Sequence, residues 1–406
     1  MNIVHIEDFF HPDAGYQCNI LLKYMVLEGH KVSLITSEMN KMPDYMTSFF
    51  GKDDIEKKDE EFTKKTGVDI YRVPIYKYFS GRSIYKPGIK KLVNSLSPDV
   101  LYIHGNDSVI GILYTIRSKK APYPIILDSH MLEMASKNPL KNLFRIFYKT
   151  FITPIIIKQK IQIIRIQDDD YIEKFLGIPL TLSPFISVGS DTLLFHPDDV
   201  TRRNFRKENL INENDFVILY AGKLDESKGG KLLAEAFLKI IESKKNKNII
   251  LIVVGNIISD EYGNGVRELF NKSENRILFF PTQKYIDLPK YFQSADLVVF
   301  PKQCSLSFFD AEACGVPVVS EDNNINVERL KFNNGFTFKS GDIEDFRDKI
   351  ALCIDMDDKK YSKMKTDSQS FVYKNYNYAD INREYMFVIN KLVSDYRKKN
   401  NLTNNV

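Results

Sequence analysis

The sequence predicts an α/β protein with two doubly wound, Rossmann-like domains, and three observations support this prediction. Short apolar runs rich in β-branched residues alternate with stretches of helical length along almost the whole chain. A segment rich in Pro, Gly and Asp, "SPFISVGSDTLLFHPDDV" at 183–200, divides the alternation into two series. The length of 406 residues is too great for a single core and fits two domains of ordinary size.

The first series of expected strands begins at the N-terminus with "NIVHIE". A helix over 17–29 that ends at Gly29 follows, and then the strand "KVSLITS". Further expected strands come at helix-length intervals: "GVDIYRVPI", "DVLYIHG", "PIILDSH" and "QIIRIQD". Because parallel strands need helical crossovers, this rhythm favours βαβ units on a parallel sheet.

The second series repeats the pattern after residue 200. Its expected strands are "DFVILYAGK", "NIILIVVGN", "RILFFP", "DLVVFP" and "VPVVSED". The last periodic stretch, at 381–398, predicts one terminal helix. We therefore expect an N-terminal domain over 1–190, a C-terminal domain over 191–380, and a helix with a loose tail over 381–406.

Composition and charge exclude several classes of protein. Hydrophobic residues make up 43% and charged residues 27%, as in a soluble globular protein, and a net charge of +4 gives no reason to expect nucleic-acid binding. The four cysteines are scattered and have no histidine at ligand spacing, so neither a metal site nor a disulfide framework is expected. No run reaches the length of a spanning helix and no signal peptide is recognisable, so a cytoplasmic protein is expected.

Residues 137–160, "KNPLKNLFRIFYKTFITPIIIKQK", interleave Lys and Arg with large apolar side chains. Such a segment suits an amphipathic face that rests on an anionic membrane. It equally suits a surface helix whose apolar stripe packs on the sheet, and Pro154 is expected to end any long helix here. Peripheral contact with the inner membrane face is therefore one of two interpretations.

Ligands of doubly wound sheets collect beyond the carboxyl ends of the strands, so residues directly after strands are the candidates for a site. In "YAGKLDESKGGKLLAEAF", Gly222 and Lys223 end a strand, and Lys228 and Gly229 begin a helix. Two cations five residues apart around a turn could bind a diphosphate. The alternative is a solvated surface turn with ordinary lysines.

A second candidate is the segment "FPKQCSLSFFDAEACGVPVVSE". Here a strand ends at 300–301, and a helix that starts near Ser305 or Ser307 carries Asp310. A carboxylate within the first turn or so of a helix could accept hydrogen bonds from two neighbouring hydroxyls of a ribose. The alternative is an ordinary helix-to-strand connection with Asp310 at the surface.

These segments resemble motifs of the retaining GT-B glycosyltransferases of the GT4 type. "AGKLDESKGGKLLAEAF" resembles the signature G-R-L-x-x-x-K-G-x-x-x-L-x-x-A, and "DLVVFP…DAEACGVPVV" resembles E-x7-E-A-x-A-C-G-x-P-V-V. The segment between the domains is similar to "SPFISVGSDTLLFHP", and two strands of the family's N-terminal domain are similar to "SPDVLYIHG" and "PIILDSH". "NYNYADINREY" is similar to the segment where the family's last helix crosses back to the N-terminal domain. The resemblance covers almost the whole chain and implies two Rossmann-like domains that face a cleft.

The resemblance assigns the donor site to the C-terminal half. It implies that Lys223 and Lys228 hold the pyrophosphate of the donor beside Gly222, and that Asp310 binds the ribose hydroxyls. It further implies that Ser305, Leu306 and Ser307 offer backbone N–H groups to the sugar or phosphate. The first Glu of the E-x7-E pair is absent, because Lys302 stands at its position with Gln303 beside it.

In the N-terminal half, His130 matches the family's histidine near the donor sugar and phosphate, so the resemblance implies a catalytic role for it together with the two lysines. His104 would line the acceptor side. Gly15, in the first turn "FFHPDAGYQCN", would let the backbone approach phosphate or sugar without a Cβ in the way. Asp13 and Tyr16 of the same turn are the remaining acceptor-side candidates.

The implied reaction moves a sugar from a UDP- or GDP-linked donor to a hydroxyl of a glycan or lipid-linked acceptor with retention of configuration. No metal or other cofactor is expected. Such a reaction would belong to the synthesis of surface polysaccharides or glycoconjugates. The alternative is a non-catalytic GT-B scaffold or partner subunit of a glycosylation complex, which the missing Glu favours. A Rossmann oxidoreductase is disfavoured because GxGxxG is absent from both halves.

Overall fold

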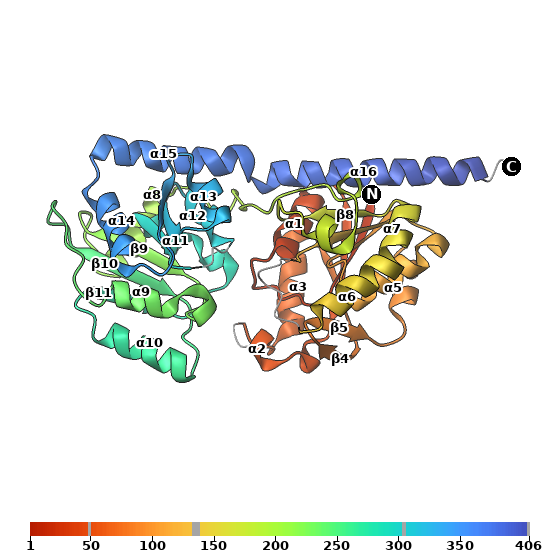
Figure 1. Cartoon of the computed structure of the whole chain (residues 1–406), viewed down its shortest axis with the longest axis horizontal. Helices are drawn as coiled ribbons and strands as arrows, with labels where there is room; N and C mark the ends of the chain where they lie inside the picture. Colours follow the sequence, from red (N-terminus) through yellow and green to blue (C-terminus); the bar gives the residue numbers. More distant parts are fainter. Residues whose placement is uncertain (48–49, 132–138, 303–305, 404–406) are drawn as a thin grey trace. The chain divides into compact units, whose positions relative to one another are not determined.

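The computed structural model describes residues 1–47, 50–131, 139–302 and 306–403 (Figure 1). The chain forms two compact units. Unit 1 consists of Met1–Val188 together with Ala379–Val406, and unit 2 consists of Gly189–Tyr378. The chain thus builds most of unit 1, passes through unit 2 and returns to unit 1 for its last helix.

Unit 1 is built on a six-stranded sheet whose neighbouring strands are all parallel, in the order β3-β2-β1-β6-β7-β8. Its strands are β1 (Asn2–Glu7), β2 (Lys31–Ser37), β3 (Asp69–Val73), β6 (Val100–Ile103), β7 (Ile125–Ser129) and β8 (Gln162–Arg165). Its helices before the crossing are α1 (Gln17–Leu27), α2 (Asp44–Thr47), α3 (Ile55–Thr66), α4 (Ile89–Ser95), α5 (Val109–Arg117), α6 (Lys141–Phe147) and α7 (Thr153–Gln159).

The expected strand "GVDIYRVPI" is two strands in the structure. β3 ends at Val73, directly before Pro74, and β4 (Ile75–Phe79) begins after it. Proline has no N–H to give to the ladder, which explains why the parallel sheet does not continue past this point. β4 instead pairs with β5 (Arg82–Tyr85) in an antiparallel hairpin, which the sequence pattern did not predict.

Unit 2 repeats the architecture with the strand order β11-β10-β9-β12-β13-β14, again all parallel. Its strands are β9 (Phe216–Ala221), β10 (Ile249–Val254), β11 (Arg276–Phe280), β12 (Leu297–Phe300), β13 (Val318–Glu321) and β14 (Gly335–Phe338). Its helices are α8 (Asp199–Glu208), α9 (Gly230–Ala236), α10 (Glu261–Asn271), α11 (Pro289–Ser294), α12 (Ser307–Ala313), α13 (Asn324–Leu330), α14 (Ile343–Asp355) and α15 (Asp358–Asn375).

Helices lie on both faces of each sheet (Figure 1), which explains why the central strands are continuous apolar runs rather than alternating ones. All six residues of β9 are buried, and so are all four of β6. Each unit has a core of its own between sheet and helices. The predicted fold class, two doubly wound α/β domains, is confirmed.

The last helix, α16 (Tyr378–Thr403), is longer than the predicted 381–398 and belongs to unit 1 from Ala379 onward. Tyr385 accepts a hydrogen bond from Gln17 Nε2 at 2.6 Å, and Tyr396 donates one to the carbonyl oxygen of Ala121 at 2.9 Å. The expected return of the chain to its first domain is thereby confirmed. Among the residues that the structure describes, no helix combines the length and the apolar character needed to cross a bilayer.

The strand order of each unit reverses direction at one point in the sheet. In unit 1 this point lies between β1 and β6, and in unit 2 between β9 and β12. Crossover connections leave the sheet in opposite directions there, which opens a crevice beyond the carboxyl ends of the two strands. A ligand site is therefore expected among the residues that follow β1, β6, β9 and β12.

Candidate functional site

The predicted lysine turn of unit 2 lies directly beyond β9, at the switch point of its sheet. The strand ends at Ala221, and the side chain of Asp225 accepts a hydrogen bond from Lys228 N at 3.0 Å. This contact caps a single 3-10 turn that ends at Lys228, and α9 follows after it. Lys223 and Lys228 are thus held on one short turn, and burial lowers the pKa of Lys223 against the opposing effect of Asp225.

A glycine lets this turn approach the end of β12. Gly229 has φ +75°, and a Cβ there would lie 3.1 Å from Cβ of Lys302 and 3.3 Å from the carbonyl carbon of Pro301. Lys302 in turn donates a hydrogen bond from Nζ to the carbonyl oxygen of Glu226 at 3.2 Å. The residue that replaces the expected acidic one therefore contacts the same turn, which gathers three cationic side chains at the switch point.

Gly255 is a residue of this region that the sequence reasoning missed. It follows β10 with φ +152°, and a Cβ there would lie 2.0 Å from the carbonyl oxygen of Gly222. The backbone after β9 and the backbone after β10 can pass each other only because position 255 has no side chain. The glycine directly after "NIILIVV" was the available signal.

The predicted ribose ligand, Asp310, lies in α12 and is 2% exposed. Its Oδ1 accepts hydrogen bonds from Ser190 Oγ at 2.7 Å and from Tyr285 OH at 3.4 Å. Burial raises the pKa of Asp310 to about 8. The carboxyl group therefore has two protein partners, and its contact with a ribose stays a prediction.

The loop before α12 carries the other donor-side candidates. Ser307 is the first residue of α12, and Leu306 directly precedes it with its carbonyl oxygen accepting from Phe309 N at 3.0 Å. Ser305 lies outside the residues that the structure describes. The backbone contacts predicted for this loop stay predictions.

In unit 1, four titratable side chains that lie within or directly after β1, β6 and β7 are close together. His5 Nδ1 lies 3.1 Å from His104 Nε2, and His104 Nδ1 lies 2.7 Å from Asp128 Oδ2. His130 Nε2 lies 3.4 Å from the other oxygen of Asp128. The sequence predicted His104 and His130 for separate tasks, and the structure links them through one carboxylate.

Asp128 is buried, yet its carboxylate has several donors. Besides the two imidazoles, Gly105 N donates to it at 2.7 Å and Tyr102 OH at 3.2 Å. Burial opposes the charged form, but the neighbouring His104 and His130 hold the pKa of Asp128 well below its usual value.

The same group has a spacing that metal ligands can have. One nitrogen or oxygen from each of His104, Asp128 and His130 lies within 4.8 Å of the others. Both oxygens of Asp128 already have contacts with donors of the protein, so we interpret these three residues as a hydrogen-bonded cluster.

His130 is the member of this cluster that reaches solvent, with a side chain 39% exposed where those of His104 and Asp128 are buried. Burial disfavours its charged form, but the adjacent Asp128 carboxylate raises the pKa of His130 above its usual value. His5 differs, because burial and the nearby His104 lower its pKa strongly. An imidazolium at position 130 can donate hydrogen bonds to an anion, whereas His5 is a neutral buried partner.

The first turn of unit 1 holds the remaining candidates. Asp13 forms an ion pair with Lys58 of α3, Oδ2 to Nζ at 3.6 Å. Tyr16 is 47% exposed, and its backbone N–H donates to Asn19 Oδ1 at 3.3 Å at the start of α1. Gly15 is partly exposed between them. These three residues lie together on one turn, as predicted from their spacing, while their contact with an acceptor stays a prediction.

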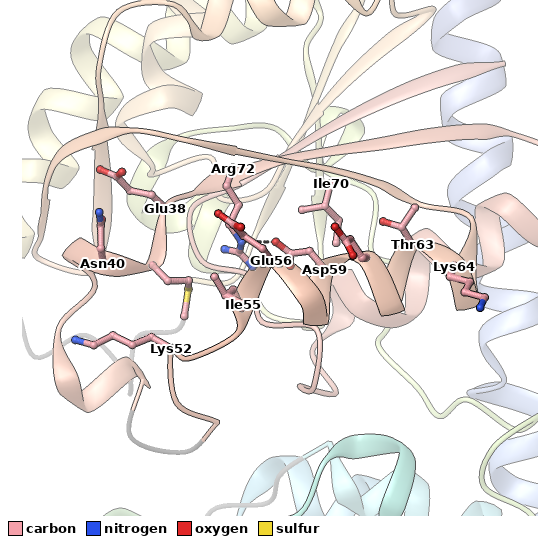
Figure 2. A pocket seen from close by; sticks show the side chains of 12 residues that line it. Glu38, Asn40, Lys52, Ile55, Glu56, Asp59, Thr63, Lys64, Ile70 and Arg72 are labelled. Atoms are coloured by element: carbon pink, nitrogen blue, oxygen red, sulfur yellow. Dashed lines mark hydrogen bonds and ion pairs between the residues drawn. The ribbon is translucent and has the colours of Figure 1, made fainter.

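Unit 1 also contains a cavity of about 910 Å³ that no sequence motif indicated. Figure 2 shows that it lies along α3, with Glu56 and Asp59 from that helix and Glu38 and Arg72 from the sheet side. Arg72 and Asp59 form a two-pronged ion pair at 2.6 and 2.9 Å. The sequence reasoning missed the cavity because a run such as "IEKKDEEFTKK" is typical of a solvated helix.

The segment 137–160 is helical over residues 141–159, and its residues 137 and 138 lie outside the described part of the chain. α6 passes through a wide turn at Tyr148–Ile152 into α7, and Pro154 occupies the first turn of α7, where it needs no hydrogen-bond donor. Pro154 therefore begins a helix, contrary to the expectation that it ends one. Leu143, Ile146 and Phe151 are exposed to solvent.

Comparison with known proteins gives a consistent picture. Residues 201–371 match the family model described as glycosyl transferases group 1. A D-inositol 3-phosphate glycosyltransferase of Corynebacterium aurimucosum is 26% identical over 188 residues, which are 44% of each chain. The match therefore spans less than half of that relative's length. The putative glycosyltransferase EpsD of Bacillus subtilis is 23% identical over 272 residues, 64% of this chain and 69% of EpsD.

Two solved structures share the fold over nearly the whole chain. A glycosyltransferase of Rickettsia africae superposes with a TM-score of 0.73 at 14% identity and covers 97% of this chain and 98% of its own. HepE of Anabaena, solved with UDP and glucose, has a TM-score of 0.71 at 16% identity, with 96% and 100% covered. The resemblance to GT-B glycosyltransferases expected from the sequence is thereby confirmed.

Proposed function

We propose that this chain, whose residues 201–371 match the model of the glycosyl transferases group 1 family, transfers a sugar from a nucleotide-diphosphate donor to a hydroxyl acceptor with retention of configuration. The observation that carries the proposal is the gathering of Lys223, Lys228 and Lys302 at the switch point of unit 2. A diphosphate is the ligand chemistry that such a group of cations recognises.

The donor's diphosphate binds to the lysine turn and its ribose to Asp310. A uridine or guanosine nucleotide is the proposed carrier, and the presence of UDP in the HepE structure favours uridine. Lys302 stands at the position of the acidic residue that would contact the donor sugar. A cation there favours a donor whose sugar offers oxygen acceptors or a negative charge near the diphosphate.

In the transfer step, His130 donates a hydrogen bond to the anionic part of the donor as the sugar–phosphate bond breaks. The charged form that Asp128 supports is the form that can stabilise developing negative charge. The departing phosphate takes the proton of the attacking hydroxyl, so no protein nucleophile is required. Asp13, Gly15 and Tyr16 form the proposed acceptor side of unit 1. His104, which was expected on that side, is instead buried with its two ring nitrogens facing Asp128 and His5.

The reaction is proposed to run without a metal ion, because lysines supply the positive charge that a divalent cation would otherwise supply. Treatment of the enzyme with EDTA should leave its rate unchanged. A strict requirement for magnesium would contradict this part of the proposal.

The acceptor is proposed to be a glycan or a lipid-linked intermediate of surface polysaccharide or glycoconjugate synthesis, with unit 1 resting on an anionic bilayer. Exposed Leu143, Ile146 and Phe151 lie among lysines, and residues 139–167 contain no Asp or Glu. α5 packs against α7 and adds exposed Ile116. Apolar side chains with a surrounding positive charge are the features that anchor a protein in an anionic lipid surface.

Vesicle flotation tests the bilayer proposal. The protein should float with vesicles of phosphatidylcholine and phosphatidylglycerol at low salt, and much less with phosphatidylcholine alone. An Ile146→Glu/Phe151→Glu variant should stay at the bottom of the gradient. Leu352→Glu, which alters another exposed apolar residue, in α14 of unit 2, should float as the wild type does. Equal flotation of all three proteins would contradict the proposal.

The second candidate function is a non-catalytic subunit of a glycosylation complex, and the observation that favours it is Lys302 in place of the acidic residue. One experiment separates the two functions. The wild-type protein is incubated with a panel of UDP- and GDP-sugars, and released nucleotide diphosphate is measured together with the anomeric configuration of the free sugar.

Release from at least one donor, in the same anomeric form as the donor, is the result expected of a retaining transferase that transfers sugar to water. Lys228→Ala should abolish the release, and Lys231→Ala should not, because Lys231 lies on α9 and pairs with Glu235. No release from any donor, with nucleotide binding intact, would favour the non-catalytic function.

A further inference from the structure

We propose that Asp128 is a positioning residue, which fixes the ring of His130 at the carboxyl end of β7 so that one ring nitrogen is held against the protein and the other faces solvent. The chemical meaning of this placement rests on the function proposed above. The placement itself rests on the contacts among β1, β6 and β7. It assigns a role to two residues, Asp128 and His5, that the sequence reasoning did not select.

The contacts first show why Asp128 has a fixed position. Its carboxylate oxygens accept from Gly105 N at 2.7 Å, from His104 Nδ1 at 2.7 Å and from Tyr102 OH at 3.2 Å. The first donor is backbone and the other two belong to buried rings. Because three short contacts hold the carboxylate, the longer contact to His130 at 3.4 Å is the one that can adjust.

His104 is itself fixed from both sides. Its Nδ1 faces Asp128 and its Nε2 faces His5 Nδ1 at 3.1 Å, so one proton is shared between the two imidazoles. Tyr102 stacks against His5 at a centroid distance of 4.9 Å and lies 4.7 Å from the ring of His104. His5 therefore completes a row of buried rings behind the carboxylate, and none of these rings can turn without breaking a contact.

His130 is held differently, because it follows the last residue of β7 and its side chain is 39% exposed. The carboxylate binds Nε2, which leaves Nδ1 as the nitrogen that can reach a ligand. A histidine whose one nitrogen is bound by a carboxylate has a defined tautomer and ring orientation. Position 130 is thus a donor with a fixed direction, whereas an isolated exposed histidine would sample several rotamers.

A purely structural role for Asp128 is the competing explanation. It would predict that the removal of its charge lowers stability alone, with His130 unaffected apart from unfolding. The positioning role predicts opposite effects on His130 from two substitutions. Asp128→Asn removes the negative charge, so the imidazolium loses its partner. Tyr102→Phe removes one donor from the carboxylate, so the carboxylate interacts more strongly with His130.

The test is an NMR titration of the full-length protein with ¹⁵N-labelled histidine, which reads the tautomer and the titration midpoint of each ring. In Asp128→Asn the midpoint of His130 should fall by about one pH unit or more, and its preference for one tautomer should be lost. In Tyr102→Phe, which keeps the ring and leaves no charge unpaired, the midpoint should rise. Asp99→Asn, which alters a carboxylate that accepts from Asn2 N and pairs with Arg397, is the matched control and should change neither.

Turnover provides the second measurement. Asp128→Asn should lower kcat by about 100-fold with KM nearly unchanged, as His130→Gln should. The double variant should be no slower than either single variant, because the carboxylate acts through the imidazole. Additive losses, or a titration midpoint and tautomer of His130 that stay unchanged in both Asp128→Asn and Tyr102→Phe, would overturn the proposal.

The two measurements, the NMR titration and the turnover assay, separate this inference from the function on which it rests. If the wild-type protein releases no nucleotide from any donor, the proposed function fails, and the titration still decides whether Asp128 positions His130. If Asp128→Asn does not fold, Tyr102→Phe decides the same question, since an unchanged midpoint in that variant would overturn the inference.

Discussion

The two switch points of the molecule hold their charges in opposite ways. In unit 1 the charged group is a buried carboxylate, Asp128, whose oxygens are filled by donors from the protein. In unit 2 the charges are two lysines of a short, glycine-dependent turn, Lys223 and Lys228, and a third, Lys302, which follows β12 and contacts that turn. The same strand arrangement thus supports a rigid hydrogen-bonded array in one unit and a cationic turn in the other.

The difference follows from the cost of burying charge. A carboxylate beneath the surface must be satisfied by the protein itself, because an unpaired buried charge costs several kcal/mol. A lysine near the surface keeps access to water, so its charge costs far less than a buried charge and it can still contact an anion that arrives from solvent. Unit 1 is therefore suited to position a single imidazole, and unit 2 is suited to bind a ligand that carries its own negative charge.

The largest expected effect is the loss of turnover in His130→Ala. Its imidazole is the solvent-reaching end of the unit 1 array, so sugar transfer should slow by roughly 100-fold or more. Stability should change little, because the side chain is 39% exposed. Nucleotide release and thermal unfolding are both measured. The control is His30→Ala, which alters the residue directly before the amino end of β2. Normal rates in His130→Ala would remove unit 1 from the chemistry.

The pH dependence of turnover has a definite sign. The pKa of His130 is raised in the folded protein, so the imidazolium is present at low pH and is lost as pH rises through that folded pKa. Turnover should therefore fall about tenfold per pH unit on the alkaline side. The Asp128–His130 ion pair, which stabilises the folded protein, should weaken over the same pH range. A rate that rises through this window would show that the neutral imidazole is the active form.

The smallest expected effects concern two glycines of unit 2. Gly229→Ala places a Cβ at φ +75° against Lys302 and should destabilise the protein by about 1–2 kcal/mol, and it should also weaken nucleotide binding. Gly265→Ala, in the middle of α10 with open space around it, should stabilise the protein by about 0.5–1 kcal/mol. Urea unfolding measures both. Equal effects of the two substitutions would mean that the turn at Gly229 is not constrained by β12.

Most of the fold could be predicted because buried parallel strands are apolar runs at regular spacing. "DFVILYAGK" and "NIILIVVGN" show this pattern, and both became central strands. The β4–β5 hairpin could not be predicted in the same way, because its strands are short and half-exposed and the break depends on one proline. The return of the last helix to unit 1 depended on the family resemblance, since periodicity alone does not say against which sheet a helix packs.

The candidate site could be predicted only in part. Lys223 and Lys228 are close in sequence, so their shared turn was visible from spacing. Asp128 and His5 were missed because their importance comes from pairing between strands distant in sequence. A histidine inside the apolar strand "NIVHIE" and an aspartate two residues before His130 were the available signals, and neither shows the partner until β1, β6 and β7 lie side by side.

Calorimetric titration of nucleotide diphosphates into three variants tests the central comparison most directly. The account predicts that UDP or GDP binds the wild-type protein, and that Lys223→Ala/Lys228→Ala weakens the binding by about 100-fold or more, since each charge-assisted contact contributes about 1.5–3 kcal/mol. His130→Ala and Lys231→Ala should retain the wild-type affinity within a few-fold. Wild-type affinity in the double lysine variant would contradict the assignment of the diphosphate to the switch point of unit 2.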